Sequence, residues 1–407
     1  MASTLRSTVG IAAFAALALA TAPSLAQKVY GPGVTDTEIK LGNTNPYSGP
    51  ASSYGTIGKT LKAFWAMVNA EGGINGRKIN FVTMDDGYSP PKTKEQVRKL
   101  VESEKVLAIF QSLGTPTNSA VHTYVNRKKV PHLFVATGAT KWGDPKNFPW
   151  TMGWQPNYQT EGRIYARYLL ANKPDARIGV LYQNDDAGKD YLKGMRDGLG
   201  DKADSMVVAV ETYETTDPTV DSQVVNLKHA GANVFYLAGI PKFSAQAIRK
   251  KADIGWDALT LLTSVNASVS ATLKPAGLAA SQGIISTVYL KDPTDESWKD
   301  DPEYKEWLAF MDTYYPEGDK AEPFNVYGYA AGLTMKHVLE NCGDNLSREN
   351  LMKQVANIRG FHAKMLLPGI LINTSPTDFF PIETMQMQRF EGERWIRFGD
   401  PISSESS

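Results

Sequence analysis

Short apolar runs rich in β-branched residues alternate along this chain with longer segments of helical periodicity, and this alternation constrains the fold. The runs predict strands at residues 39–43, 79–84, 106–110, 133–135, 178–182, 206–210, 234–237, 259–262 and 284–288. Between the first two runs, one apolar stripe recurs at helical spacing: Ile57, Leu61, Phe64, Trp65 and Val68. Strands that alternate with helices form parallel sheets covered by helices on both faces. The sequence therefore predicts an α/β fold with doubly wound parallel sheets.

The length of the chain and two breaks in its pattern indicate two domains. The 407 residues exceed the roughly 250–300 that one hydrophobic core usually holds. An aromatic and proline-rich stretch at residues 150–156 is the first candidate crossover, and residues 288–293 are the second. Beyond them the pattern predicts helices at 302–315, 324–340 and 348–358, then short strands at 370–373, 385–390 and 395–398.

Two dipeptides predict helix starts, because each places a capping side chain before a proline at the first helical position. They are Thr115-Pro116 and Asp217-Pro218. The first follows a predicted strand directly, so the N-terminus of its helix is expected at a strand end.

The first 26 residues have the pattern of a secretory signal peptide. Arg6 precedes an apolar stretch at residues 9–20, which is too short to span a bilayer. Ser24 and Ala26 then place small residues at positions −3 and −1 of a cut after Ala26. We therefore expect cleavage there and a mature protein in the periplasm.

Composition and motifs argue against several classes of function. Lys and Arg together number 43, as do Asp and Glu, so no excess charge favours nucleic acid. The sequence contains no G-x-S-x-G, Walker A, H-E-x-x-H or C-x-x-C motif, and no two of its five histidines have metal-ligand spacing. We therefore expect no enzyme, no cofactor and no metal site. The single cysteine, Cys342, is expected to be a buried apolar side chain without a disulfide.

Loops rich in small and hydroxyl-bearing residues follow three predicted strands, at residues 45–55, 111–115 and 136–140. Open α/β sheets bind ligands at the carboxyl ends of their strands. Such loops present N–H groups, hydroxyls and a helix N-terminus, which suit a carboxylate. Each loop alone also fits an ordinary cap or turn, but three of them converge on one crevice.

The segment at residues 69–79, Asn-Ala-Glu-Gly-Gly-Ile-Asn-Gly-Arg-Lys-Ile, closely resembles a helix–turn–strand signature of a known family. That family is the periplasmic leucine/isoleucine/valine-binding proteins of ABC transporters. The segments at 47–55, 85–91 and 327–332 add to the resemblance, which covers nearly the whole mature chain.

The resemblance implies a type I periplasmic binding protein: two doubly wound lobes joined by three hinge crossovers. Lobe 1 would hold residues 27–152 and 288–372, and lobe 2 residues 153–287 and 373–407. The ligand would bind between the lobes of a monomer, and closure would create the form that an ABC permease recognises.

Loop matching to the family implies eight ligand-binding residues: Tyr54, Ser112, Leu113, Gly114, Gly138, Ala139, Thr140 and Phe324. Tyr54 would pack near the ligand side chain, and Phe324 would supply a ring from the hinge side. The loop at 112–114 and the Thr140 hydroxyl would contact the ligand carboxylate.

The sequence also departs from the family. Where Gly114 stands the branched-chain binders carry a serine, so Ser112 or Thr115 would have to replace that contact. The family's disulfide positions correspond to Tyr88 and Leu113. The family's lobe-two tyrosine is missing from residues 184–188.

The acid that pairs a ligand ammonium in the family should lie near residues 262–266, which contain none. An unpaired buried ammonium costs several kcal/mol, whereas burial of a leucine-sized side chain returns only about 1.5–3 kcal/mol. Either Asp185 or Asp186 serves instead, or the ligand has no ammonium. An aromatic cluster near the first crossover could stack a ligand ring or pack the hinge, and we favour hinge packing: Trp142, Trp150, Trp154 and Tyr158.

These observations lead to one hypothesis and two alternatives. The hypothesis is an extracytoplasmic solute-binding component of an ABC importer, for a branched-chain-type amino acid or a related apolar or aromatic carboxylate. A secreted ligand-sensing subunit of a receptor would share this fold. A secreted α/β hydrolase is disfavoured because no nucleophile motif is present.

Overall fold

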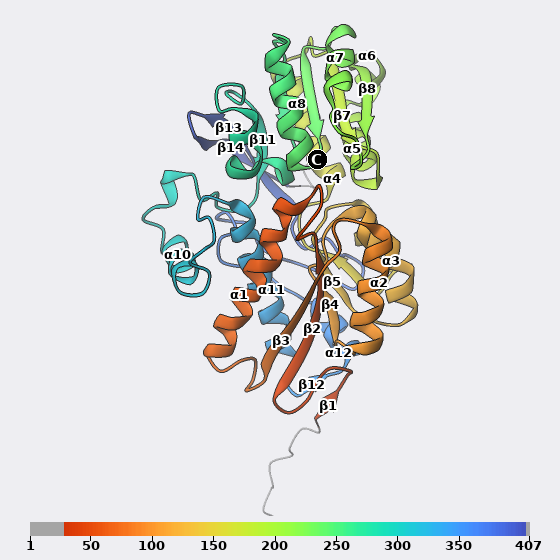
Figure 1. Ribbon diagram of the computed structural model, residues 1–407, viewed down its shortest axis with the longest axis vertical. Coiled ribbons are helices and arrows are strands. Elements are labelled where there is room, and N and C mark those ends of the chain that lie inside the picture. The colour runs from red at the N-terminus through yellow and green to blue at the C-terminus, as the bar shows by residue number, and fades with distance from the viewer. Residues whose placement is uncertain (1–27, 404–407) are drawn as a thin grey trace, which may run out of the picture.

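Two β-sheets, one above the other in Figure 1, organise the chain. The computed structural model describes residues 28–403, so the predicted signal peptide at 1–26 lies outside the described residues. Within residues 28–403, no helix is long and apolar enough to cross a membrane.

The lower sheet has five strands in the order β3-β2-β4-β5-β6, all paired in parallel. Its strands are β2 (Glu38–Asn45), β3 (Lys78–Asp85), β4 (Ala108–Phe110), β5 (His132–Val135) and β6 (Thr151–Gly153). The helices between them are α1 (Gly55–Ala70), α2 (Pro90–Arg98) and α3 (Thr115–Arg127). The first strand therefore lies inside the sheet, and the order reverses between β2 and β4. Doubly wound sheets bind ligands at such a reversal.

The upper sheet has seven strands in the order β14-β13-β11-β10-β9-β7-β8 and repeats this winding. Its parallel strands are β7 (Ile178–Gln183), β8 (Val207–Tyr213), β9 (Val234–Ala238), β10 (Leu259–Leu262) and β11 (Ile285–Val288). Its main helices are α4 (Tyr158–Asn172), α5 (Asp186–Leu199), α7 (Asp221–His229) and α8 (Pro241–Asp253). Two antiparallel strands extend one edge, β13 (Thr384–Glu391) and β14 (Arg394–Ser403).

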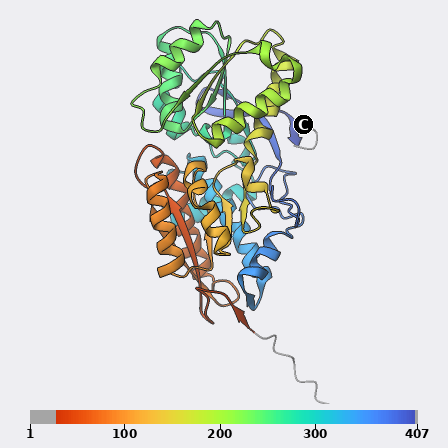
Figure 2. The same cartoon turned by 90° about the vertical axis from the view of Figure 1, so that its right-hand side faces the viewer.

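The chain passes between the two sheets three times (Figure 2). It rises from β6 to α4, descends after β11, and rises again before β13. The descending part supplies α10 (Pro302–Tyr314), α11 (Pro323–Cys342) and α12 (Arg348–Val355). The prediction of two doubly wound parallel-sheet lobes joined by three crossovers is confirmed. The residue numbers at which the lobes divide stay a prediction.

Shorter elements complete the fold. A two-stranded parallel sheet pairs β1 (Val29–Tyr30) with β12 (Asn345–Leu346). Short helices are α6 (Ala203–Met206) and α9 (Lys274–Ala276), with single turns η1 (Ser52–Tyr54), η2 (Lys99–Ser103), η3 (Thr140–Gly143), η4 (Gly200–Lys202), η5 (Ser264–Asn266), η6 (Val269–Leu273) and η7 (Glu296–Trp298). Cys342, expected to be buried, is 5% exposed at the end of α11.

Three sequence predictions about elements were wrong. Residues 370–373 form no strand, because Ile370 and Ile372 are buried as part of a long loop that makes only a single bridge there. Asp217 does not cap a helix: its carboxylate accepts from the Glu214 N–H at 2.8 Å in a turn, and α7 begins at residue 221. Thr115 does not cap α3 either: Gly114 occupies the N-cap position, and Thr115 is the first residue of the helix.

Helix α1 packs its predicted apolar stripe into the lower core, where it meets α11 closely. Phe64 is fully buried and lies over Gly332 of α11. A Cβ atom at residue 332 would lie 2.6 Å from the Cδ1 atom of Phe64. The two helices can therefore approach only because residue 332 has no side chain.

Gly332→Ala should lower the free energy of unfolding by about 1–3 kcal/mol, because a ring in a full core must shift. This loss should exceed the roughly 1 kcal/mol that alanine gains over glycine in helix propensity. Urea denaturation measures the difference, and an equally or more stable variant would contradict the packing described here.

Candidate functional site

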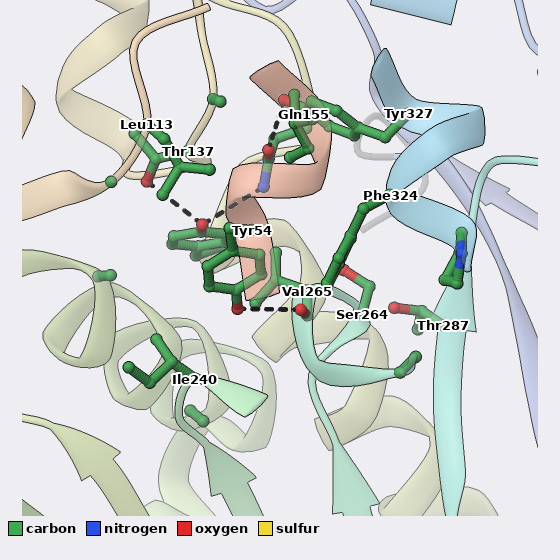
Figure 3. A pocket seen from close by; sticks show the side chains of 18 of the residues that line it. Tyr54, Leu113, Thr137, Gln155, Ile240, Ser264, Val265, Thr287, Phe324 and Tyr327 are labelled. Carbon is green, nitrogen blue, oxygen red and sulfur yellow. Dashed lines mark hydrogen bonds between the residues drawn. The ribbon is translucent and has the colours of Figure 1, made fainter. Parts of the chain in front are cut away.

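A cavity of about 120 Å³ lies between the two sheets, where the carboxyl ends of their strands face each other. The lower sheet lines it with loops after β4 and β5, including Leu113, Thr115 and Thr137. The upper sheet lines it with loops after β9 and β10, and the crossovers add further side chains. Figure 3 shows Leu113 and Thr137 on one side and Ser264 and Thr287 on the other.

Several aromatic rings line the cavity: Tyr54, Tyr88, Tyr158, Tyr191, Tyr289, Phe324 and Tyr327. The rings of Tyr54 and Phe324 have centroids 4.9 Å apart, and Tyr158 stacks on Tyr191 at 4.2 Å. For scale, a cavity of about 150 Å³ in a protein core can hold benzene. The space therefore suits one small ring or a branched aliphatic chain, and has no room for a long acyl chain.

One end of the cavity carries hydrogen-bond donors. Thr115 lies in the first turn of α3, whose N–H groups lack intrahelical acceptors and carry the positive end of the helix dipole. Its hydroxyl contacts the Thr137 hydroxyl, which lies 3.2 Å from the phenol oxygen of Tyr158. Because Thr115 and Thr137 are almost fully buried, this end of the cavity suits an anionic oxygen.

Hydrogen bonds between the lobes hold the cavity closed. The Tyr54 hydroxyl donates to the carbonyl oxygen of Val265 at 3.0 Å, as drawn in Figure 3. Burial raises the pKa of Tyr54 well above its usual value, so the phenol keeps the proton that it donates. The Thr140 N–H donates across the cleft to Oδ2 of Asp190 at 2.6 Å. The structure is thus the closed arrangement of the two lobes.

Four of the eight sequence-predicted residues line this cavity: Tyr54, Leu113, Gly114 and Phe324. The other four lie outside its lining: Ser112, Gly138, Ala139 and Thr140. A role in ligand binding stays a prediction for all eight. Of the two candidates to replace the family's serine, Thr115 faces the cavity and Ser112 does not.

Ser112 is instead tied into the interior of the lower lobe. Its hydroxyl lies 2.7 Å from Nε2 of His132 and donates to Oδ1 of Asn118 at 2.6 Å. All three side chains are buried and none lines the cavity, so this Ser–His contact gives no support to a hydrolase. Thr140 uses its backbone for the contact to Asp190, and its Oγ1 atom faces no partner.

Gly114 is glycine because Tyr88 occupies the space that a side chain would need. A Cβ atom at residue 114 would lie 2.4 Å from Cε2 of Tyr88. The residue also has a φ of +96°, which side chains disfavour. Tyr88 and Leu113, the two positions of the family's disulfide, both line the cavity here. The Tyr88 ring therefore fills the part of the wall next to Gly114.

An acid does lie beside residues 262–266, contrary to the sequence expectation, and it comes from α4. Glu161 accepts hydrogen bonds from the N–H and hydroxyl of Ser264 at 2.6 and 2.9 Å. It also accepts from Thr287 Oγ1 at 2.8 Å and from the Tyr191 hydroxyl at 3.3 Å. The Tyr165 hydroxyl also lies 3.0 Å from Oε1 of Glu161. Because these donors occupy both carboxylate oxygens, Glu161 positions the wall and does not line the cavity.

The acids proposed to pair an ammonium are also engaged elsewhere. Asp185 caps α5 by accepting from the Gly188 N–H at 3.0 Å, and its other oxygen accepts from Gln183 at 2.7 Å. Asp186 is half exposed and pairs with Lys141 at 3.0 Å. Neither lines the cavity.

Asp292 is the one acid among the described residues that line the cavity. It lies just after β11 in the second crossover and is 7% exposed. Burial raises its pKa to about 6. Its Oδ1 atom accepts from the N–H and hydroxyl of Thr294 at 2.8 and 2.5 Å. The neighbouring Lys291 is neutralised by Asp301 at 2.7 Å and by Glu303 at 2.9 Å.

Sequence reasoning missed several lining residues: Tyr88, Thr137, Gln155, Gln183, Tyr289, Asp292 and Tyr327. Thr137 lay in a loop that was singled out, and Gln155 lay in the predicted first crossover. Tyr289 and Asp292 lay in the predicted second crossover, and Tyr88 and Tyr327 lay in segments that carry the family resemblance. Nothing local indicated that their side chains or that of Gln183 face the cavity, because this depends on how the lobes meet. Of the aromatic cluster near the crossover, Tyr158 lines the cavity, while Trp154 packs on Tyr327 in the hinge. Among residues 28–403, no cluster of three metal-ligating side chains occurs.

Glu322 caps α11 next to Phe324 and joins the lobes. Its carboxylate accepts from the Phe324 N–H at 3.2 Å and from the Ser268 hydroxyl, in the upper lobe, at 2.7 Å. Burial is the largest influence on this group and raises its pKa from 4.5 to about 7. The folded protein thus binds a proton here more tightly than the unfolded chain does.

Stability should therefore fall with rising pH through this group. The contribution of protonated Glu322 is present below about pH 4.5 and is lost as the pH rises through about 7. Glu322→Gln should remove up to about 3 kcal/mol of this loss, as estimated from the pKa change. Urea denaturation of both proteins at pH 4.5 and pH 8 measures it. Equal pH dependence in both would contradict the assignment.

Comparison with known proteins identifies relatives. A family model described as "Periplasmic binding protein" matches residues 38–394. The protein named Leu/Ile/Val-binding protein homolog 1 from Brucella abortus is 25% identical over 317 residues, which cover 77% of this chain and 81% of that protein.

Solved structures share the fold. A branched chain amino acid ABC transporter protein from Thermus thermophilus with bound valine superposes with a TM-score of 0.80 at 15% identity, covering 91% of this chain and 97% of that one. A fatty acid ABC transporter substrate-binding protein from Thermomonospora curvata gives 0.78 at 22% identity, covering 93% and 96%.

Proposed function

The chain belongs to the periplasmic binding protein family, and from this premise we propose that it is the solute-binding component of an ABC importer. Members of this family bind small molecules and are not enzymes. The observation that carries the proposal is the closed cavity between two hinged lobes, which has rings along its wall and donors at one end. Such a cavity can enclose and release a solute without chemistry.

The donor end supports a carboxylate as the polar part of the solute. Thr115 and the first turn of α3 offer a hydroxyl, N–H groups and a positive helix end without a counter-anion in the wall beside them. The remaining wall includes several aromatic rings and about 120 Å³ is available, which favours one ring or a branched chain. We therefore propose an apolar or aromatic carboxylate of small size.

The buried acids favour a solute without an ammonium. Glu161 and Asp185 accept from other donors and lie outside the cavity lining, and among the described residues only Asp292 lines the cavity as an acid. Asp292 lies in the second crossover, whereas Thr115 belongs to the lower sheet's loops. A branched-chain-type amino acid remains the second candidate, because the names of the relatives point to it and Asp292 could pair its ammonium.

The protein would act in the periplasm as a monomer and deliver its solute to an ABC permease in the inner membrane. A ligand-sensing subunit of a receptor would use the same cavity. Capture of membrane partners separates the two roles: an importer component retains a permease, whereas a sensing subunit retains a receptor.

A thermal-shift screen should identify the solute class, because a ligand that binds only the folded protein raises its melting temperature. The panel pairs leucine, isoleucine, valine and phenylalanine with their deaminated acids, and adds benzoate. We expect the acids without an ammonium to give the larger shifts. Shifts with leucine and none with any deaminated acid would contradict this expectation.

Thr115→Ala should weaken binding of the best carboxylate by about ten-fold or more, since a hydrogen bond to a charged group contributes about 1.5–3 kcal/mol. Thr140→Ala is the matched control, because it removes the same atoms from a hydroxyl outside the cavity lining. Isothermal titration calorimetry measures both. A larger loss in Thr140→Ala would favour the site inferred from family loops over the one described here.

Asp292→Asn tests the charge of the solute. It should leave the affinity for a deaminated acid within about three-fold, because no ammonium depends on it, and should abolish binding of an amino acid. Calorimetry with leucine and 4-methylpentanoate makes the comparison. A large loss for the acid alone would contradict the proposed orientation.

A further inference from the structure

A continuous row of hydrogen bonds runs along the cavity wall from the hinge to the donor end. The Tyr327 hydroxyl donates to Oε1 of Gln155 at 2.9 Å, and Nε2 of Gln155 donates to the Tyr158 oxygen at 3.3 Å. The row continues from Tyr158 to Thr137 at 3.2 Å and ends at Thr115. Figure 3 shows the bonds that join Tyr327, Gln155 and Thr137 through a phenol oxygen.

Gln155 sets the direction of this row, because its amide oxygen can only accept a hydrogen bond and its amide nitrogen can only donate one. An amide nitrogen can only donate, so the Tyr158 oxygen must accept from it. In the Tyr158–Thr137 and Thr137–Thr115 contacts, either hydroxyl can be the donor. In the arrangement that the Gln155 amide favours, Tyr158 donates its single proton to Thr137, and Thr137 donates its own to Thr115. The proton of Thr115 is left without a partner in the row and is available to the cavity.

All five residues line the cavity and none is more than 7% exposed: Thr115, Thr137, Gln155, Tyr158 and Tyr327. Their low exposure limits contact with bulk water, which would otherwise let each hydroxyl rotate independently. In such a setting, aligned hydrogen bonds polarise one another. Burial keeps the pKa of Tyr158 high, at about 12, so its proton stays in the row.

We infer that Gln155 is a positioning residue that makes the Thr115 hydroxyl a hydrogen-bond donor toward the solute. It would thereby select solutes whose polar group accepts hydrogen bonds. This inference rests on the proposed function and deepens it, since Gln155 acts through Tyr158 and Thr137 on the Thr115 hydroxyl. Gln155 lies between β6 and α4, in the first crossover. The residue that sets the direction of the hydrogen bonds at Thr115 is thus part of the hinge.

Gln155→Glu reverses the row. The introduced carboxylate can only accept, so Tyr158 would donate to it, Thr137 to Tyr158, and Thr115 to Thr137. The Thr115 hydroxyl would then present only lone pairs to the solute. Calorimetry at pH 8, where the introduced acid is ionised, should show at least about ten-fold weaker binding of 4-methylpentanoate or benzoate, whichever binds wild type more tightly.

A second substitution separates reversal from damage. The affinity of Tyr158→Phe alone is measured as the reference for the double variant, since this change removes one member of the row and leaves Thr115 in place. Added to Gln155→Glu, it disconnects the introduced acid from the two threonines and should restore most of the lost affinity. Removal of the Tyr158 hydroxyl is expected to restore the affinity lost in Gln155→Glu only if Gln155 and Tyr158 act through one row of hydrogen bonds.

Gln388→Glu is the matched control for charge, because Gln388 also lines the cavity but bonds to Thr287 O at 3.4 Å, outside the row. Its loss of affinity measures plain repulsion, and Tyr158→Phe should not restore it. The inference is overturned if Tyr158→Phe fails to rescue Gln155→Glu, or rescues both acids equally.

Thermal unfolding establishes that each variant is folded. If Gln155→Glu does not fold, Gln155→Met replaces it. The double variant of Gln155→Met and Tyr158→Phe should then bind the acid no more weakly than the single variant with the lower affinity. Additive losses of affinity would overturn the inference. Failure of every carboxylate to bind wild type would overturn the proposed function and the inference together. Binding without rescue would overturn the inference alone.

Discussion

The opposition of two sheet edges is the constraint on which the rest of this structure depends. Both parallel sheets place their first strand inside, so each has a reversal of strand order, between β2 and β4 below and between β7 and β9 above. The strands run so that the carboxyl ends of both sheets face the same gap. The loops there include Thr115 below and Ile240 and Ser264 above, and closure brings them into one wall.

Closure has a cost that the wall is built to offset. Removing polar groups from water is unfavourable unless each finds a partner. Glu161 meets this need for Ser264, Thr287 and Tyr191 at once, and so fixes the upper wall without facing the cavity. The row from Tyr327 to Thr115 does the same for the lower wall, but leaves one proton unused at its end. The two networks therefore differ. All donors around Glu161 have a protein acceptor, whereas the row that ends at Thr115 leaves one hydroxyl proton for a bound ligand.

The fold could be predicted to a large extent from the sequence, because strands and helices are encoded by local periodicity. The predicted strand at 178–182 and the stripe from Ile57 to Val68 needed only neighbouring residues to be recognised. Half of the residues predicted from loop position line the cavity, as with Tyr54 and Leu113. The loop at 138–140 lies outside the cavity lining, and the Thr140 N–H contacts Asp190. Loop position says which residues are near a cleft, but not which side of the loop faces it.

By itself, the sequence determined the class of fold, the number of lobes and the strand ends at which a site had to lie, because these follow from the spacing of apolar residues and from chain direction. Only the tertiary structure decided which side chains form the wall. Glu161 and Gln155 act on partners as distant along the chain as Ser264 and Tyr327, so no local pattern marks them. Direction along a row of hydrogen bonds is likewise a property of the assembled set, since each hydroxyl can donate or accept until its neighbours fix it.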